Sequence, residues 1–222
     1  MIIHLCFSLF SILAVTSLVA ESRMGWTILF DGNDLSKFRC YQKQQPGESW
    51  KVENGIMKFK KKKNGAEKEN LITIDKFQFF DLRLDWMLPV PGNSGIIFRV
   101  AETDGPPYKT GPEMQIFHQM NAGVETDTGS CYGLYPPEVA NMNPVGQWNK
   151  SRLLIKPGNR VSHFLNGELL CSYLMGGDDW KKRVENSKFK NWEQFGKISR
   201  GHICLQDHGS EIWFRNIRLK RL

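Results

Sequence analysis

The segment Phe80-Asp81-Leu82-Arg83-Leu84-Asp85-Trp86 alternates between apolar and charged residues. Side chains of a β-strand point alternately to opposite faces, so this pattern predicts a long, half-buried strand. Further period-2 segments recur along the chain, and the Asn-Gly pairs at 54–55 and 166–167 are typical of tight hairpin turns. The predicted strands span 50–53, 56–59, 80–86, 96–100, 113–119, 148–155, 161–165, 168–173, 203–206 and 212–219.

About ten short strands separated by turn signals predict an all-β protein, an antiparallel sandwich of two sheets. One helix is expected, from Asp179 to about Asn186, with Asp178 as its N-cap and with Trp180 and Val184 on one face. A chain of 222 residues without internal repeats fits a single domain. The polar stretch 60–70 is predicted to be a loop inside that domain.

The chain is basic, with a formal net charge of +7, and five of its positive charges come from Lys58 and the run Lys60–Lys63. One lysine-rich patch is typical of a solvated loop or a protected sheet edge. No base-reading motif accompanies it, so nucleic-acid binding is not predicted.

The first twenty residues indicate a signal peptide. Residues 5–20 are apolar and contain no Asp, Glu, Lys or Arg, and Val19-Ala20 before Glu21 forms a plausible cleavage site. An uncleaved membrane anchor is the alternative. The favoured interpretation is a mature domain of residues 21–222, exported to the periplasm or cell surface, without a stable membrane span after cleavage.

Four cysteines remain in that domain: Cys40, Cys131, Cys171 and Cys204. Their wide spacing, without a C-x-x-C pair, argues against a zinc site. Three disulfide pairings are possible in an exported protein, and four buried free thiols are equally compatible with the sequence.

The strand 113–119 carries the most chemistry. Glu113, Gln115 and Phe117 share one face, and Met114 and Ile116 point to the other. An acid, an amide and a ring on one sheet face suit a groove that hydrogen-bonds and stacks a sugar. A solvent-facing strand with a chance glutamate is the alternative.

Other candidate residues lie at strand ends and turns, where functional groups are often displayed. Arg99 is expected to share a face with Ile97 and to pair with a carboxylate such as Glu113 or to clamp a substrate. His208 titrates near neutrality and follows a strand end. By contrast, His163 alternates with apolar residues and is expected to be a hydrogen-bonded core histidine. The remaining candidates for the pocket are Asn93, Gln206 and Asp207.

Nine short blocks resemble, in order, a known family: 25–32, 50–55, 92–99, 113–116, 129–135, 146–149, 163–167, 205–209 and 214–217. Together they are similar to the 3-keto-disaccharide hydrolase family. The resemblance implies the jelly-roll sandwich of the concanavalin A-like lectin/glucanase type. It also implies an exported bacterial hydrolase that acts on disaccharides or glycosides oxidised at C3.

The resemblance implies that seven residues line the pocket. The candidate catalytic residues among them are Glu113, His208 and Arg99, and the candidate substrate-binding residues are Asn93, Gln115, Gln206 and Asp207. Position 118 is often acidic in the family and is His118 in this chain, which leaves no clear role for it. Retaining glucanases of this fold carry E-x-D-x-x-E, whereas this chain has Glu113-x-Gln115-x-x-His118, so a double displacement by two carboxylates is not expected.

A 3-keto sugar allows another route, because the ketone makes the C2 hydrogen acidic. Glu113 or His208 would be the base, and Arg99 or a metal would stabilise the enolate. The residues specify no cofactor, and the option they leave open is a divalent cation held by Glu113, Asp207 and His208. The alternative functions are a non-catalytic carbohydrate-binding module and a structural surface protein, since fold alone does not fix function. The discriminating feature is whether Glu113, Arg99 and His208 converge on one pocket.

Overall fold

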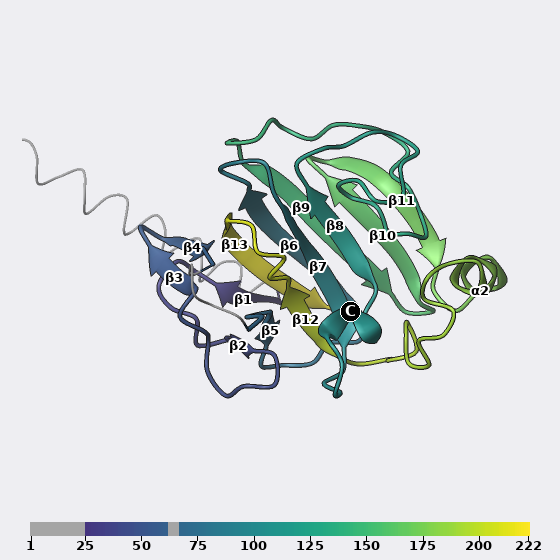
Figure 1. The fold of residues 1–222 in the computed structure, drawn as a ribbon, viewed down its shortest axis with the longest axis horizontal. Helices are drawn as coiled ribbons and strands as arrows, with labels where there is room; N and C mark the ends of the chain where they lie inside the picture. Colours follow the sequence, from purple (N-terminus) through teal and green to yellow (C-terminus); the bar gives the residue numbers. More distant parts are fainter. Residues whose placement is uncertain (1–24, 62–66) are drawn as a thin grey trace, which may run out of the picture.

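The computed structural model describes residues 25–61 and 67–222. It forms two antiparallel sheets that pack face to face (Figure 1). The strands of the larger sheet are β1 (Trp26–Phe30), β3 (Trp50–Glu53), β4 (Ile56–Phe59), β6 (Phe80–Met87), β9 (Asn149–Lys156), β10 (Arg160–Leu165), β11 (Glu168–Leu174) and β13 (Ile212–Arg221). Those of the smaller sheet are β2 (Phe38–Cys40), β5 (Leu71–Thr73), β7 (Asn93–Val100), β8 (Glu113–Phe117) and β12 (His202–Leu205).

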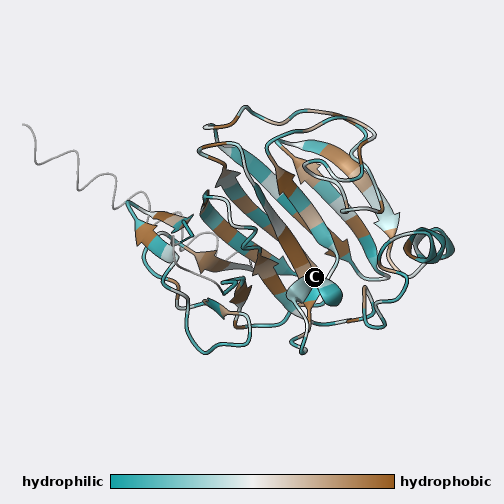
Figure 2. Cartoon of the chain, in the orientation of Figure 1, coloured by the Kyte–Doolittle hydropathy of each residue, from teal (hydrophilic) through white to brown (hydrophobic). Residues whose placement is uncertain are grey.

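The larger sheet has the order β11-β10-β9-β6-β13-β4-β3, with β1 also paired to β13, and the smaller sheet has the order β2-β5-β12-β7-β8. Apolar and polar residues alternate along the strands, as Figure 2 shows. The inward-facing side chains of both sheets form one hydrophobic core, which includes Leu82, Trp86, Phe98, Met114 and Ile116. The pattern at 80–86 therefore has the predicted cause, because its apolar positions lie in this core.

A second, smaller cluster lies on the outer face of the five-stranded sheet. It consists of Tyr41, Ile72, Ile97, Val100 and Cys204, all of them buried. An apolar patch on the outer face indicates that something covers this side of the sheet. The candidate site lies on this side of the sheet.

All ten predicted strands are present, and the two-sheet sandwich is confirmed. The prediction missed β1, β2 and β5, and the short 3-10 helix η1 (Pro107–Lys109). The predicted helix is α2 (Asp178–Glu185), but its N-cap is Gly177 and not Asp178. Trp180 is buried as expected. The predicted signal peptide lies outside the described residues, and among those that are described no helix is long and apolar enough to cross a membrane.

Candidate active site

A cavity of about 370 Å³ opens on the outer face of the five-stranded sheet. It is lined by Asn93, Tyr108, Gly111, Glu113, Gln115, Tyr132, Lys188, Phe189, Trp192, Phe195, Gln206 and His208. The strand register brings together the residues on the sheet side of the cavity, which we call its floor. Gly95 of β7 lies opposite Gln115 of β8. The backbone N–H of Gln206, just after β12, donates to the carbonyl of Gly95 at 2.9 Å. Glu113, Gln115 and Gln206 therefore share one face, as the alternation of β8 predicted.

Glu113 is seated over two small or apolar neighbours. Ile97 is its register partner across β7, and a methyl group added at Gly95 would overlap its carboxylate. Gln206 donates through Nε2 to Oε2 of Glu113 at 3.4 Å. Burial raises the pKa of Glu113 to about 8, although the positive charge of Lys188 and the bond from Gln206 act in the opposite direction. This carboxyl group is therefore mostly protonated at neutral pH.

The polar floor also offers hydrogen-bond acceptors. Gln115 is held in place, because its Nε2 donates to the carbonyl of Thr126 at 3.2 Å. In contrast, Oδ1 of Asn93 and Oε1 of Gln206 are buried and have no hydrogen-bond partner among the described residues. Buried acceptors without a partner are costly, so these two oxygens are suited to accept bonds from hydroxyl groups of a ligand.

The opposite wall is aromatic and comes mainly from the segment after α2. Phe189 and Phe195 stack with ring centroids 4.2 Å apart, and Trp192 packs edge-on against Phe189 at 5.0 Å. Lys188 places its Nζ 4.2 Å from the ring centroid of Tyr132. A polar floor facing aromatic rings is an arrangement that suits a sugar ring.

Sequence reasoning did not identify this wall. The signal was present, since Phe189, Trp192 and Phe195 are spaced three residues apart in a polar segment that fits neither the predicted helix nor a strand. Unexplained large aromatics in an irregular segment could have indicated a binding surface. The contribution of Lys188 has no comparable signal in the sequence.

His208 stands where the cavity meets a second hollow of about 530 Å³, and Tyr108, Gln206 and His208 line both. Burial, and secondarily the charge of Lys68, lowers the pKa of His208. Its imidazole is therefore neutral at neutral pH and can accept a proton. The lining of the second hollow includes the charged residues Lys43 and Lys68 and residues of the loop that leads to η1.

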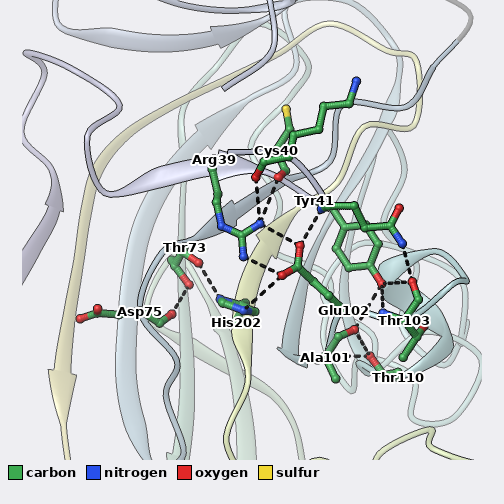
Figure 3. Close-up of polar contacts among 12 residues, drawn as sticks. Arg39, Cys40, Tyr41, Thr73, Asp75, Ala101, Glu102, Thr103, Thr110 and His202 are labelled. Atoms are coloured by element: carbon green, nitrogen blue, oxygen red, sulfur yellow. Dashed lines mark hydrogen bonds and ion pairs between the residues drawn. The ribbon is translucent and has the colours of Figure 1, made fainter. Parts of the chain in front are cut away.

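An ion-pair network fixes the wall of this second hollow (Figure 3). Both terminal nitrogens of Arg39 bond to Glu102, at 2.8 and 2.6 Å, and the bonds hold the pKa of Glu102 down at about 2. Tyr41 accepts a bond from the amide of Thr103 at 2.9 Å and donates to the carbonyl of Gly105 at 2.9 Å. These contacts tie β2 and Tyr41 to the loop after β7, which leads to η1 and its residue Tyr108.

Arg99 does not reach the cavity, contrary to the sequence prediction. A bulge interrupts the pairing of β7 with β12, and Arg99 has a positive φ of 53°. Its Nη2 donates to the carbonyl of Gln78 and to Oδ1 of Asn159, each at 2.9 Å. The alternation that would have placed it beside Ile97 fails at the bulge, and Arg99 joins the two sheets instead.

The carboxylate of Asp207 also has structural partners. Its carboxylate accepts bonds from the amides of Glu69 and Gly209, at 2.9 and 2.8 Å, and it pairs with Lys61 at 3.3 Å. It lines the second hollow and not the first. Within residues 25–61 and 67–222, no group of three or more His, Cys, Asp or Glu is arranged to hold a metal, so Glu113, Asp207 and His208 do not form the cation site considered from the sequence.

The remaining histidines and the cysteines have structural surroundings. His163 is buried, its ring nitrogens are 3.0 Å from the carbonyl of Gly129 and from the hydroxyl of Tyr173, and burial lowers its pKa to about 4. The core role predicted for it is confirmed. His118 contacts the carbonyl of Gly92 and does not line the cavity. The four described cysteines, Cys40, Cys131, Cys171 and Cys204, are buried free thiols, the second of the two possibilities.

Comparison with known proteins now identifies the family. The model of the 3-keto-alpha-glucoside-1,2-lyase-like domain matches residues 25–220. The chain belongs to this family. It is 31% identical to the 3-keto-disaccharide hydrolase of Bacteroides thetaiotaomicron over 229 residues, which cover 89% of this chain and 79% of that protein. The family resemblance inferred from sequence is confirmed, and with it the expectation of an enzyme that acts on glycosidic bonds.

Solved structures agree. A protein of Parabacteroides distasonis described as a candidate glycosyl hydrolase superposes with a TM-score of 0.82 at 33% identity, covering 91% of this chain and 96% of that one. The protein BuGH16Bwt superposes with a TM-score of 0.53 at 10% identity, over 88% of this chain and 92% of that one. This second likeness concerns the fold alone, and it confirms the lectin/glucanase type of sandwich.

Proposed function

We propose that this protein cleaves the glycosidic bond of disaccharides or glycosides that carry a ketone at C3, by elimination followed by addition of water. The main support is one cavity that keeps Glu113 protonated near neutral pH and His208 unprotonated. The surroundings raise the pKa of Glu113 and lower that of His208, so the first group is suited to be the acid and the second the base. The names of the family, a 1,2-lyase, and of the relative, a 3-keto-disaccharide hydrolase, agree with this substrate class and with an elimination across C1 and C2.

The first step removes the C2 proton. The neutral imidazole of His208 takes it, the electrons of the C2–H bond form a C2=C3 double bond, and the ketone oxygen gains the negative charge. Glu113 donates its carboxyl proton in a hydrogen bond to that oxygen. The ammonium group of Lys188, which lines the same cavity, adds the positive charge that the sequence prediction had assigned to Arg99.

The second step breaks the glycosidic bond. The ketone re-forms, a C1=C2 double bond appears, and the C1–O bond breaks with its electron pair on the departing oxygen. The imidazolium of His208 returns the proton to that oxygen. Water then adds across the double bond, with hydroxyl at C1 and hydrogen at C2, so the sum of the steps is hydrolysis. His208 suits both transfers because it stands where the two hollows meet.

The second hollow would receive the leaving group. Its lining offers several hydrogen-bonding side chains, among them Lys43, Lys68, Asn70 and Asp104. Hydrogen-bonding side chains of this kind match a second sugar better than an aromatic aglycone. A disaccharide is therefore the preferred substrate class, with the keto sugar against the aromatic wall.

Two measurements test the proposal. Native and C3-oxidised forms of one disaccharide are incubated with the protein, and only the oxidised form should release monosaccharide. Deuterium at C2 of the oxidised form should slow release severalfold, because the C2–H bond breaks in the proposed first step. Release from the native form at a similar rate, or an absence of any isotope effect under single-turnover conditions, would contradict the mechanism.

Variants assign the roles. Glu113→Gln and His208→Gln should each lower turnover by roughly 10²- to 10⁴-fold. Glu193→Gln is the matched control, since Glu193 is exposed on the same segment as the aromatic wall but does not line the cavity. Turnover by Glu113→Gln within threefold of the parent would remove Glu113 from the mechanism.

A further inference from the structure

The outer face of the larger sheet carries a row of like charges. Arg218 of β13 lies directly opposite Arg83 of β6, which in turn lies opposite Arg152 of β9. Neighbouring strands are about 4.8 Å apart, and like charges directly opposite one another destabilise a sheet. We call these three residues the arginine row.

A bulge in β13 places Arg218 on the same face of the sheet as Arg215. The register of β13 against β6 shifts between Arg215 and Arg218, and Asn216 at the bulge has a positive φ of 55°. In a regular strand, residues three positions apart point to opposite faces. The extra residue lets Arg215 and Arg218 share the outer face, an example of a bulge that redirects a side chain.

Two carboxylates of the described residues lie among these basic side chains. Asp81 accepts two bonds from Arg152, at 2.9 and 2.8 Å, and two from Arg83, at 3.3 and 3.1 Å. Asp85 accepts bonds from Arg215 at 3.2 Å and from Asn216 at 2.8 Å. Lys150 and Lys220, on the neighbouring strand positions opposite Asp85 and Asp81, add two more positive charges. Among the described residues of this stretch six are basic and two are acidic, and Arg83 and Arg152 share the single carboxylate of Asp81.

Aromatic rings hold the guanidinium groups against the sheet. Trp26 of β1 lies 4.9 Å from Arg83 and 5.5 Å from Arg218, and Phe164 of β10 lies 5.0 Å from Arg152. Stacked arginines lose less freedom when they bind an anion, because their planes are already oriented. Between them is a hollow of about 320 Å³, lined among others by Arg83, Arg152, Arg218, Asp85 and Phe164.

We propose that this hollow binds an anionic polysaccharide, one whose sugars carry sulfate or carboxylate groups. The arginine row supplies the complementary charge. Asp85 and Asn216 are suited to bond sugar hydroxyls, and Phe164 offers a ring for stacking. The sequence contains no base-reading motif, which argues against a nucleic acid as the ligand. The hollow lies on the other side of the sandwich from the cavity with Glu113, so both can be occupied together.

The test is binding to three polymers: dextran sulfate, polygalacturonate and uncharged dextran. We expect binding to at least one charged polymer and none to dextran, with affinity falling as salt is raised. Binding to dextran sulfate alone indicates sulfate recognition, and binding to both indicates that either anion suffices. The proposal would be overturned if the protein bound neither of the two charged polymers.

Variants place the binding on the row. Arg218→Gln and Arg152→Gln should each weaken binding about tenfold or more, while Arg160→Gln should leave it nearly unchanged. Arg160 is an exposed basic residue at the start of β10, outside the hollow, and it carries the same charge change. Thermal unfolding checks that each variant is folded. If Arg152→Gln is unstable because Asp81 has lost the two bonds from Arg152, the test rests on Arg218→Gln. Unchanged affinity in Arg218→Gln, or tighter row-dependent binding of duplex DNA than of dextran sulfate, would overturn the proposal.

Discussion

Replacing Glu113 by glutamine should remove activity and at the same time stabilise the fold. The unfolded chain ionises this carboxyl near its ordinary pKa of 4.5, whereas the folded protein holds it protonated up to about pH 8. Between these values the folded state binds one proton more than the unfolded state, so stability falls as pH rises. The amide of glutamine does not titrate, and the variant escapes this loss.

The size of the effect follows from the shift. Each pKa unit corresponds to about 1.4 kcal/mol, and pH 7 lies roughly 2.5 units above the unfolded pKa, so burying Glu113 costs about 3 kcal/mol at pH 7. At pH 4 the cost is close to zero. The glutamine variant should therefore unfold at a temperature about 5–10 °C above the parent at pH 7, with little difference at pH 4.

The assay is thermal unfolding, with urea unfolding beside it, of parent and variant at pH 4, 5.5 and 7. Glu102→Gln is the control of opposite sign, because the bonds from Arg39 lower the pKa of Glu102 to about 2. That carboxylate stabilises the fold above about pH 4.5 and loses its contribution as pH falls through 2, so its removal should destabilise at pH 7. A stability difference for Glu113→Gln that is negative at pH 7, or equal at pH 4 and pH 7, would refute the reasoning.

Three further predictions concern the site and the chain start. Gly95→Ala should lower turnover about 100-fold with little change in melting temperature, because the new Cβ would lie 2.6 Å from Cδ of Glu113 and displace the carboxyl; unchanged turnover would show that its position is not critical. The pH profile of kcat/KM should rise with the deprotonation of His208, below the usual histidine value, and fall above about pH 8 as Glu113 ionises; a rate that instead rises through pH 8 would make Glu113 the base. Export predicts that the native protein begins near residue 21 or 22 on N-terminal sequencing, and recovery of Met1 in a soluble cytosolic fraction would contradict it.

The two sheets could be predicted because apolar and polar residues alternate along most of their strands. Segments such as Phe80–Trp86 carry seven residues of pattern, whereas β2 and β5 have three residues each and β5 is buried throughout. A three-residue strand has too few positions to show a period. Pairing with longer neighbours, which a local pattern does not reveal, decides these strands.

The site residues that could be predicted from the sequence are likewise those on regular strands. Glu113 and Gln115 were placed correctly because β8 is regular over their positions, and one-face alternation then holds. Lys188 and the aromatic wall were missed because they sit on an irregular segment that only tertiary packing brings to the sheet. Arg99 was misplaced because alternation gives the wrong face beyond a bulge, and nothing in the local sequence marks the bulge.

The bulge at Arg99 has a consequence for the chemistry of Glu113. Two glutamates of this protein show what a guanidinium does: Glu102, bonded by Arg39, has its pKa lowered to about 2, and Glu113, seated on Ile97, has its pKa raised to about 8. Without the bulge, Arg99 would point to the outer face two residues beyond Ile97 and close to Glu113. It would ionise the carboxyl and remove the proton that the proposed mechanism needs. The positive charge comes instead from Lys188 on a separate loop, which lowers the pKa of Glu113 too little to offset burial.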